Sequence, residues 1–157
     1  MPTTARMLRL PLMAGAILSL AGAALAQTAP LAPFTQAEVT AGHASYIAYC
    51  STCHGETLQG GGDAPPLGGA FFSADWSKYS IGKLYAFVSN AMPQGLEGDL
   101  KPAEYSDIIA FLLAADGARP GTTAFDKNSS VNIGSIISGV PVPAVINAPV
   151  PETGAAQ

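Results

Sequence analysis

The sequence predicts an all-α fold with long loops. Apolar side chains recur at the three- and four-residue spacing of a helix face in three segments, near residues 36–49, 80–90 and 102–113. No alternating strand pattern appears between residues 35 and 117, while 17 glycines and 13 prolines in 157 residues favour loops. That length fits one ordinary domain, or two small ones.

The first expected helix begins with a capping box. Thr35 is the predicted N-cap and Glu38 the N3 residue, so that each side chain binds a backbone N–H near the other. The helix should then run from about Gln36 to Cys50. Its residues at helical spacings are Val39, Gly42, Tyr46, Ile47 and Cys50. The glycine-rich stretch at 60–62 should form a loop.

The second helix should begin after Ser80, which can act as its N-cap, and end near Asn90. Its apolar stripe consists of Ile81, Leu84, Tyr85 and Val88. This helix is expected to deliver Met92, which follows its end.

The third helix should have Pro102 at its first position and Gly117 just beyond its end. Lys101 or Asp99 is the residue available as N-cap. The apolar residues of this helix are Tyr105, Ile108, Ile109, Phe111, Leu112 and Leu113.

The two ends of the chain differ from its middle. Residues 1–26 have the pattern of a cleaved export signal: two arginines, an uncharged apolar run, and an Ala-Leu-Ala tripeptide ending at residue 26. The alternative is an uncleaved membrane anchor, for which the run is near the lower length limit. Residues 27–34 should be a short linker, 35–117 the folded domain, and 118–157 a low-complexity, flexible tail. A second possibility is that 131–142 folds back on the domain or adds to a partner surface.

The predicted mature chain is acidic and lacks a second long apolar run, so we expect no transmembrane segment in it. Two of the seven basic residues lie in the signal, which leaves five against 11 acidic residues and a net charge of about −6. This charge excludes nucleic acid as a partner. It favours encounter with a basic protein surface.

The chemistry of the chain is concentrated in Cys50-Ser51-Thr52-Cys53-His54. Cys-x-x-Cys-His is the attachment motif for one covalent c-type haem. Each thiol of Cys50 and Cys53 adds to one vinyl group, and His54 can then bind the iron as proximal axial ligand. The alternatives are a thioredoxin-like thiol pair, for which no βαβ pattern is visible, and a plain disulfide.

Met92 is the candidate for the distal axial ligand, because the other three methionines lie in the predicted signal. A thioether suits iron in such a site and raises the reduction potential. The alternative is that Met92 fills a gap in the core. His43 lies about two helical turns before Cys50 and is therefore badly placed to reach the distal face, so we interpret it as a structural or surface residue.

These residues resemble the class I c-type cytochromes over about residues 35–117. Gly42 and Tyr46 stand eight and four residues before Cys50, where this family has a glycine and an aromatic residue at the crossing of its first and last helices. The segment 108–112, Ile-Ile-Ala-Phe-Leu, matches the pattern of the family's last helix. The resemblance implies a small cytochrome c fold, with three main helices and long loops wrapped round one covalent haem.

The resemblance also implies further haem contacts. The Pro65-Pro66-Leu67 segment is similar to the family's Pro-x-Leu, in which the proline carbonyl accepts a hydrogen bond from the proximal histidine and the leucine packs on the haem. Phe72 and Trp76 resemble a pattern in the cytochromes that serve quinoprotein alcohol dehydrogenases. Trp76 would then bind a haem propionate, or else be a partly buried aromatic without that role.

The sequence therefore predicts a periplasmic monohaem electron carrier and not an enzyme. Its partners would be redox proteins such as a quinoprotein dehydrogenase or a terminal oxidase. One alternative is a haem peroxidase or an oxygen- or NO-reactive protein, which needs an open distal site. The other is a thiol–disulfide protein without haem.

Overall fold

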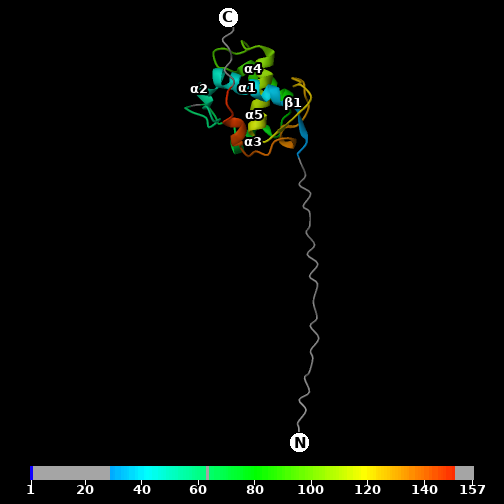
Figure 1. Ribbon diagram of the computed structural model, residues 1–157. Helices are drawn as coiled ribbons and strands as arrows, with labels where there is room; N and C mark the ends of the chain where they lie inside the picture. The colour runs from blue at the N-terminus through cyan, green and yellow to red at the C-terminus, as the bar shows by residue number, and fades with distance from the viewer. Residues whose placement is uncertain (2–28, 63, 151–157) are drawn as a thin grey trace.

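The structure, a computed structural model, describes Met1 and residues 29–62 and 64–150. The predicted export signal, apart from Met1, lies outside the described residues, as does the stretch 151–157. In chain order the elements are β1 (Leu31–Thr35), α1 (Gln36–Tyr49), α2 (Ser51–His54), α3 (Gly69–Trp76), α4 (Ile81–Ala91), α5 (Pro102–Ala115), β2 (Arg119–Gly121), the 3₁₀ helix η1 (Ile133–Ser135) and α6 (Pro143–Ile146). The predicted all-α class is confirmed, because helices dominate and only two short strands are present among these elements (Figure 1).

The three expected helices correspond to α1, α4 and α5, and their caps are those read from the sequence. The Thr35 hydroxyl accepts the Glu38 N–H at 3.2 Å, and the Glu38 carboxylate accepts the Thr35 N–H at 2.7 Å. Ser80 accepts the Lys83 N–H at the start of α4. The N-cap of α5 is Lys101, whose backbone N–H donates to a Glu104 carboxylate oxygen at 2.7 Å.

The crossing of α1 and α5 forms the centre of the fold. A Cβ atom on Gly42 of α1 would lie 1.8 Å from the Asp107 carbonyl oxygen of α5, so only glycine permits this approach. Tyr46, one turn later, is fully buried and its ring lies 5.4 Å from that of Phe111. The sequence-based expectation of a close helix crossing at Gly42 is therefore confirmed.

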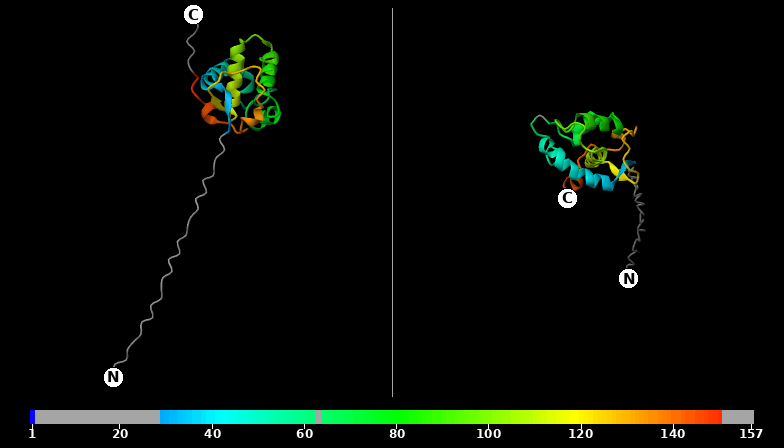
Figure 2. Two further views of the ribbon diagram at one scale, coloured as in Figure 1. Left: turned by 90° about the vertical axis from the view of Figure 1, so that its right-hand side faces the viewer. Right: turned by 90° about the horizontal axis from the view of Figure 1, so that it is seen from above.

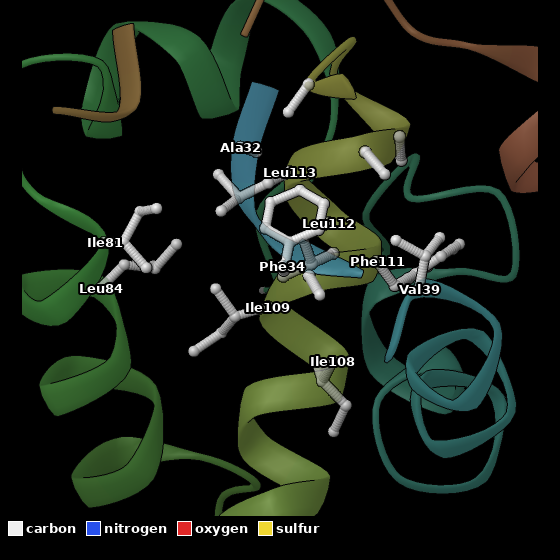
Figure 3. Packing of buried hydrophobic residues seen from close by; sticks show 14 of the residues in the cluster. Ala32, Phe34, Val39, Ile81, Leu84, Ile108, Ile109, Phe111, Leu112 and Leu113 are labelled. Atoms are coloured by element: carbon white, nitrogen blue, oxygen red, sulfur yellow. The ribbon is translucent and has the colours of Figure 1, made fainter. Parts of the chain in front are cut away.

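The hydrophobic core surrounds α5, whose residues 108–115 are all buried. Figure 3 shows α5 between α4, which contributes Ile81 and Leu84, and α1, which contributes Val39. Phe34 of β1 lies over the middle of the same helix and is completely buried. None of the described helices has the length and apolarity that crossing a membrane requires.

The linker expected at residues 27–34 is in part a strand. β1 pairs in parallel with β2, with Leu31 opposite Arg119 and Thr35 opposite Gly121. Ala32 and Phe34 alternate into the core, which fixes this segment to the domain. The structure thus differs from the prediction, because two buried side chains are too few to give a recognisable strand pattern in the sequence.

Residues 118–150 also differ from the predicted flexible tail. The yellow-to-red part of the chain lies against the helices in the views of Figures 1 and 2. Ile133, Ile136 and Ile146 are buried in the core, and the Val142 N–H donates to the carbonyl of Ala115 at the end of α5. The second possibility, that residues 131–142 fold back on the domain, is the one the structure shows.

This C-terminal segment completes the first turn of α4. The N–H groups of Ile81 and Gly82 donate to the carbonyls of Val131 and Ser129, each at 3.0 Å. A Cβ atom on Gly82 would lie 3.0 Å from the carbonyl oxygens of Lys127 and Ser129. Because the first N–H groups of a helix lack partners within the helix, the C-terminal segment acts as an additional N-cap for α4.

The helix α3 was not expected from the sequence, and Asp116 explains why it forms. The Gly69 N–H in its first turn donates to Asp116 Oδ1 at 2.5 Å. The Asp116 carbonyl in turn accepts from the N–H groups of Ser138 and Gly139 at 3.0 and 3.1 Å. A partner 47 residues away supplies this cap, so no local signal marks the beginning of the helix.

Candidate haem site

The Cys-x-x-Cys-His motif forms a single helical turn at the end of α1. Cys50 is the junction between α1 and α2 and is half-buried, whereas Cys53 is exposed. Both are free thiols. His54, the last residue of α2, is 7% exposed. Gly55, with a φ of +79°, ends the turn and redirects the chain into the following loop.

The His54 ring is oriented by the loop that follows it. Its Nδ1 lies 2.9 Å from the Pro65 carbonyl oxygen. A carbonyl can only accept a hydrogen bond, so Nδ1 carries the ring proton and Nε2 keeps its lone pair free to bind a metal. The contact that the family resemblance implied between these two residues is present in the structure.

The loop that carries Pro65 is itself held in place by nearby residues. The Tyr46 hydroxyl donates to the Gly55 carbonyl at 2.6 Å, and the Leu67 N–H donates to the Leu58 carbonyl at 2.9 Å. Leu58 is buried, so it anchors the middle of the loop in the core. Leu67 is half-buried and packs against the same core. Its predicted contact with haem stays a prediction.

Burial, with a smaller contribution from the nearby Cys53, raises the pKa of the Cys50 thiol to about 11. Cysteines that act as nucleophiles in thiol–disulfide exchange have a lowered pKa, because the thiolate is the reactive form. The environment of Cys50 is therefore the opposite of a thioredoxin-like site. A neutral, half-buried thiol is compatible with a structural thioether attachment.

Met92 is the C-cap of α4 and is half-buried. Its N–H donates to the Val88 carbonyl at 3.0 Å, which continues the hydrogen bonding of the last helical turn. Its carbonyl accepts the Tyr105 hydroxyl of α5 at 2.9 Å. Both backbone groups of Met92 are thus engaged, and its position is fixed by two helices. Its role as an axial ligand stays a prediction.

Trp76 lies among other aromatic residues at the end of α3. Its ring centroid is 5.8 Å from that of Tyr79 in an edge-on arrangement and 5.2 Å from that of Phe87. The side chain is half-buried and packs against the core. These contacts account for Trp76 as a packed aromatic residue, and the predicted bond to a propionate stays a prediction.

His43 is part of the packing between α1 and α5. It is 5% exposed, and its ring stacks on Phe111 with centroids 4.6 Å apart and an interplanar angle of 12°. Burial lowers the pKa of the imidazole, so the ring is held in its neutral form. This environment agrees with the interpretation of His43 as a structural residue.

The residues present fit a c-type haem. Two free thiols and a histidine stand on one helical turn, and the imidazole is oriented through Nδ1 so that Nε2 is available. Met92, the one methionine after the predicted signal, is fixed at the end of a helix. The donor set, two thiols for attachment with imidazole nitrogen and thioether sulfur for iron, is the one that such a group requires.

Comparison with known proteins yields a family match and a distant structural likeness. Residues 37–112 match the family described as cytochrome c oxidase, cbb3-type, subunit III. The sulfane dehydrogenase SoxCD from Paracoccus pantotrophus contains a chain with 22% identity and a TM-score of 0.40, over 76% of this chain and 63% of that one. The chain therefore spans less than two thirds of its SoxCD counterpart. None of the curated proteins compared with it matches.

Sequence reasoning missed two groups near the site. Tyr105 was recognised as an apolar position near the start of the last helix, yet its hydroxyl binds the Met92 carbonyl. A tyrosine among aliphatic residues on the buried face of a helix is a signal that a polar partner is close, because buried hydroxyl groups find one. The Ser129–Val131 contacts with α4 had no corresponding signal, since they involve backbone atoms only.

Proposed function

We propose that this chain is a monohaem c-type cytochrome that transfers single electrons between exported redox partners and is a carrier and not an enzyme. A c-type cytochrome domain indicates electron transfer, and the observation that carries the finer proposal is the orientation of His54 by Pro65. A haem bound here would supply one-electron chemistry between Fe(II) and Fe(III).

The chain's own residues have distinct roles in this proposal. Cys50 and Cys53 would attach the haem through thioether bonds from one helical turn. Pro65 holds the Nδ1 proton of His54, and this bond increases the basicity of Nε2 toward iron. The covalent attachment keeps the cofactor in place in a protein whose own core is small.

The proposed role of Met92 separates an electron carrier from a haem enzyme. A peroxidase or a gas-binding protein needs an open distal position. Met92 is held by α4 on one side and by Tyr105 on the other, so its thioether would be a fixed ligand. A stable sixth ligand favours rapid electron transfer with little rearrangement and excludes substrate from the iron.

We place the protein in the periplasm, because residues 1–26 have the pattern of an export signal and the Cys-x-x-Cys-His motif follows it. The partner would be a quinoprotein dehydrogenase, from the pattern at Phe72 and Trp76, or a terminal oxidase, the class of enzyme named in the matching family. The acidic balance of the chain favours a partner with a basic docking face.

The test is production of the full chain in a host that attaches c-type haem. Intact mass should show the loss of residues 1–26 and the gain of one haem, and the reduced protein should give sharp α and β absorption bands. A Cys50→Ala, Cys53→Ala variant is the matched control and should lack the covalent haem mass. A wild-type chain without a covalent haem would refute the proposal.

A further inference from the structure

We propose that Tyr105 is a positioning residue for the distal ligand, acting through the backbone of Met92 and the loop that follows it. The inference rests on the proposed function, because it concerns how this chain would hold Met92 on the iron. The atom that acts is the Tyr105 hydroxyl oxygen.

The hydroxyl of Tyr105 connects both ends of the Met92–Gly98 loop. It donates to the Met92 carbonyl at 2.9 Å and accepts the Gly98 N–H at 3.0 Å. A hydroxyl has one proton and two lone pairs, so a single group can close the loop in this way. The loop ends are therefore fixed to α5 and, through it, to the centre of the core.

The Tyr105 ring is held rigidly in the position that this role requires. Tyr105 is 3% exposed and lies in the first turns of α5. Its ring meets Tyr85 of α4 edge-on, with centroids 6.5 Å apart and an interplanar angle of 79°. Met92 lies at the end of α4. Tyr105 therefore contacts α4 through its ring and the Met92–Gly98 loop through its hydroxyl.

The loop between the two anchor points supplies few bonds of its own that could replace the hydroxyl. The Leu96 N–H donates to the Pro93 carbonyl at 2.9 Å, and the Gly95 N–H donates to the exposed Glu97 carboxylate at 2.8 Å. Leu96 is 51% exposed, so it does not anchor the loop by burial. Removal of the Tyr105 hydroxyl should free the segment that begins at Met92.

The effect should appear as easier loss of the thioether from iron, with the haem still attached. Tyr105→Phe removes two hydrogen bonds from a buried group, so the population of the Met-off state should rise at least about 5-fold. The haem thioethers and the His54–Pro65 contact are not altered by this substitution.

The matched control is Tyr85→Phe, which removes a hydroxyl from the neighbouring ring and leaves both bonds of Tyr105 in place. The experiment compares wild type, Tyr105→Phe, Tyr85→Phe and Met92→Ala as holoproteins. It measures the weak near-infrared band of an iron–thioether bond, the rate of cyanide binding to the oxidised protein, and the melting temperature by circular dichroism.

Tyr105→Phe should bind cyanide several-fold faster than wild type and lose the near-infrared band at a lower temperature, while Tyr85→Phe should behave as wild type. If Tyr105→Phe matches wild type in both measurements, Tyr105 has no positioning role. If Tyr85→Phe and Tyr105→Phe change both to the same extent, the effect is general packing and the inference is also refuted. A wild-type protein that lacks the haem or the near-infrared band would instead refute the proposed function, and this inference with it.

Discussion

The two segments that carry the predicted axial ligands are held by different kinds of contact. The segment around His54 is fixed by its neighbours in sequence, through the Pro65 carbonyl and the Tyr46 hydroxyl. The segment around Met92 depends on α5, through Tyr105, and the helix before it depends on the C-terminal segment. The proximal side is thus a local unit, whereas the distal side is assembled from three separate parts of the chain.

This difference has a functional consequence. Changes near His54 should act on attachment of the haem as a whole, because the thiols and the imidazole share one turn. In the proposed carrier, changes near Met92 would alter ligand strength, and hence the reduction potential, without loss of the covalently attached haem. Under the proposed function, the segment around Met92 is therefore the part of the molecule that would set the reduction potential.

The largest effect, on haem content, is expected from a substitution of His54 in the locally held segment. His54→Ala removes the predicted ligand and the bond to Pro65 together. We expect almost no folded holoprotein, measured by haem content per chain after purification. The control is His43→Gln, at the other histidine of the chain, which should retain one haem per chain. Full haem content with a normal spectrum in His54→Ala would contradict the proximal assignment.

The next largest effect is expected from truncation after Gly121. This change removes the buried side chains of Ile133, Ile136 and Ile146 and exposes the first turn of α4. Burial of each such side chain contributes about 1.5–3 kcal/mol, so the melting temperature should fall by at least about 10 °C. A chain that ends at Val150 is the control and should melt as the full chain does. Equal melting temperatures for all three would mean that this segment does not stabilise the domain.

A smaller loss of stability is expected from a substitution at the crossing of α1 and α5, the two helices that support the His54 and Met92 segments. Gly42→Ala places a Cβ atom against the Asp107 carbonyl at the crossing of α1, which leads to the motif, and α5, which carries Tyr105. Overpacking of this kind costs about 1–3 kcal/mol or more. Chemical denaturation of the holoprotein should show a lower midpoint with an unchanged slope. A midpoint equal to that of wild type would refute the tight crossing.

The smallest effect concerns the pH dependence of stability at Asp116. Burial raises the pKa of this carboxyl to about 7, opposed by the Gly69 N–H, which lowers it. The folded protein therefore binds this proton more tightly than the unfolded chain does, whose carboxyl titrates near pH 3.9. The associated stability is fully present below about pH 4 and is lost as the pH rises through about 7.

Asp116→Asn keeps an oxygen for the Gly69 N–H and carries no charge at any pH. The variant should equal or fall below wild type in melting temperature at pH 5 and exceed it at pH 8. Each unit by which the pKa is raised corresponds to about 1.4 kcal/mol. The control is Asp75→Asn at an exposed position, which should not change the pH profile. A difference between Asp116→Asn and wild type that is independent of pH would show that Asp116 is charged throughout.

Much of the central domain could be predicted from the sequence, because its signals are local. The Thr35–Glu38 box, Ser80 and Pro102 mark helix starts within three or four residues of the groups they cap. The Cys-x-x-Cys-His motif at residues 50–54 predicts covalent haem attachment without information from the rest of the chain. The contact of His54 with Pro65 came from the family resemblance, since spacing alone does not show that a carbonyl will meet an imidazole 11 residues earlier.

The parts that could not be predicted depend on backbone groups far apart in the chain. The C-terminal segment is rich in proline and has no regular period, yet Ile133 and Ile136 reach the core from a single 3₁₀ turn. The first turn of α3 is capped by Asp116, which lies 47 residues after Gly69. Interactions of this kind leave no pattern in a window of ten or twenty residues, so the sequence alone underestimates the size of the folded domain.

The central claim is that Met92 supplies the distal ligand of an electron carrier. It is tested most directly by a potentiometric titration of wild type and Met92→Ala, followed by the absorption bands of the haem. A neutral thioether stabilises Fe(II), so the potential of Met92→Ala should be lower, and its iron should bind carbon monoxide and cyanide readily. An unchanged potential together with resistance to both ligands would show that another residue, such as Lys83, is the distal ligand.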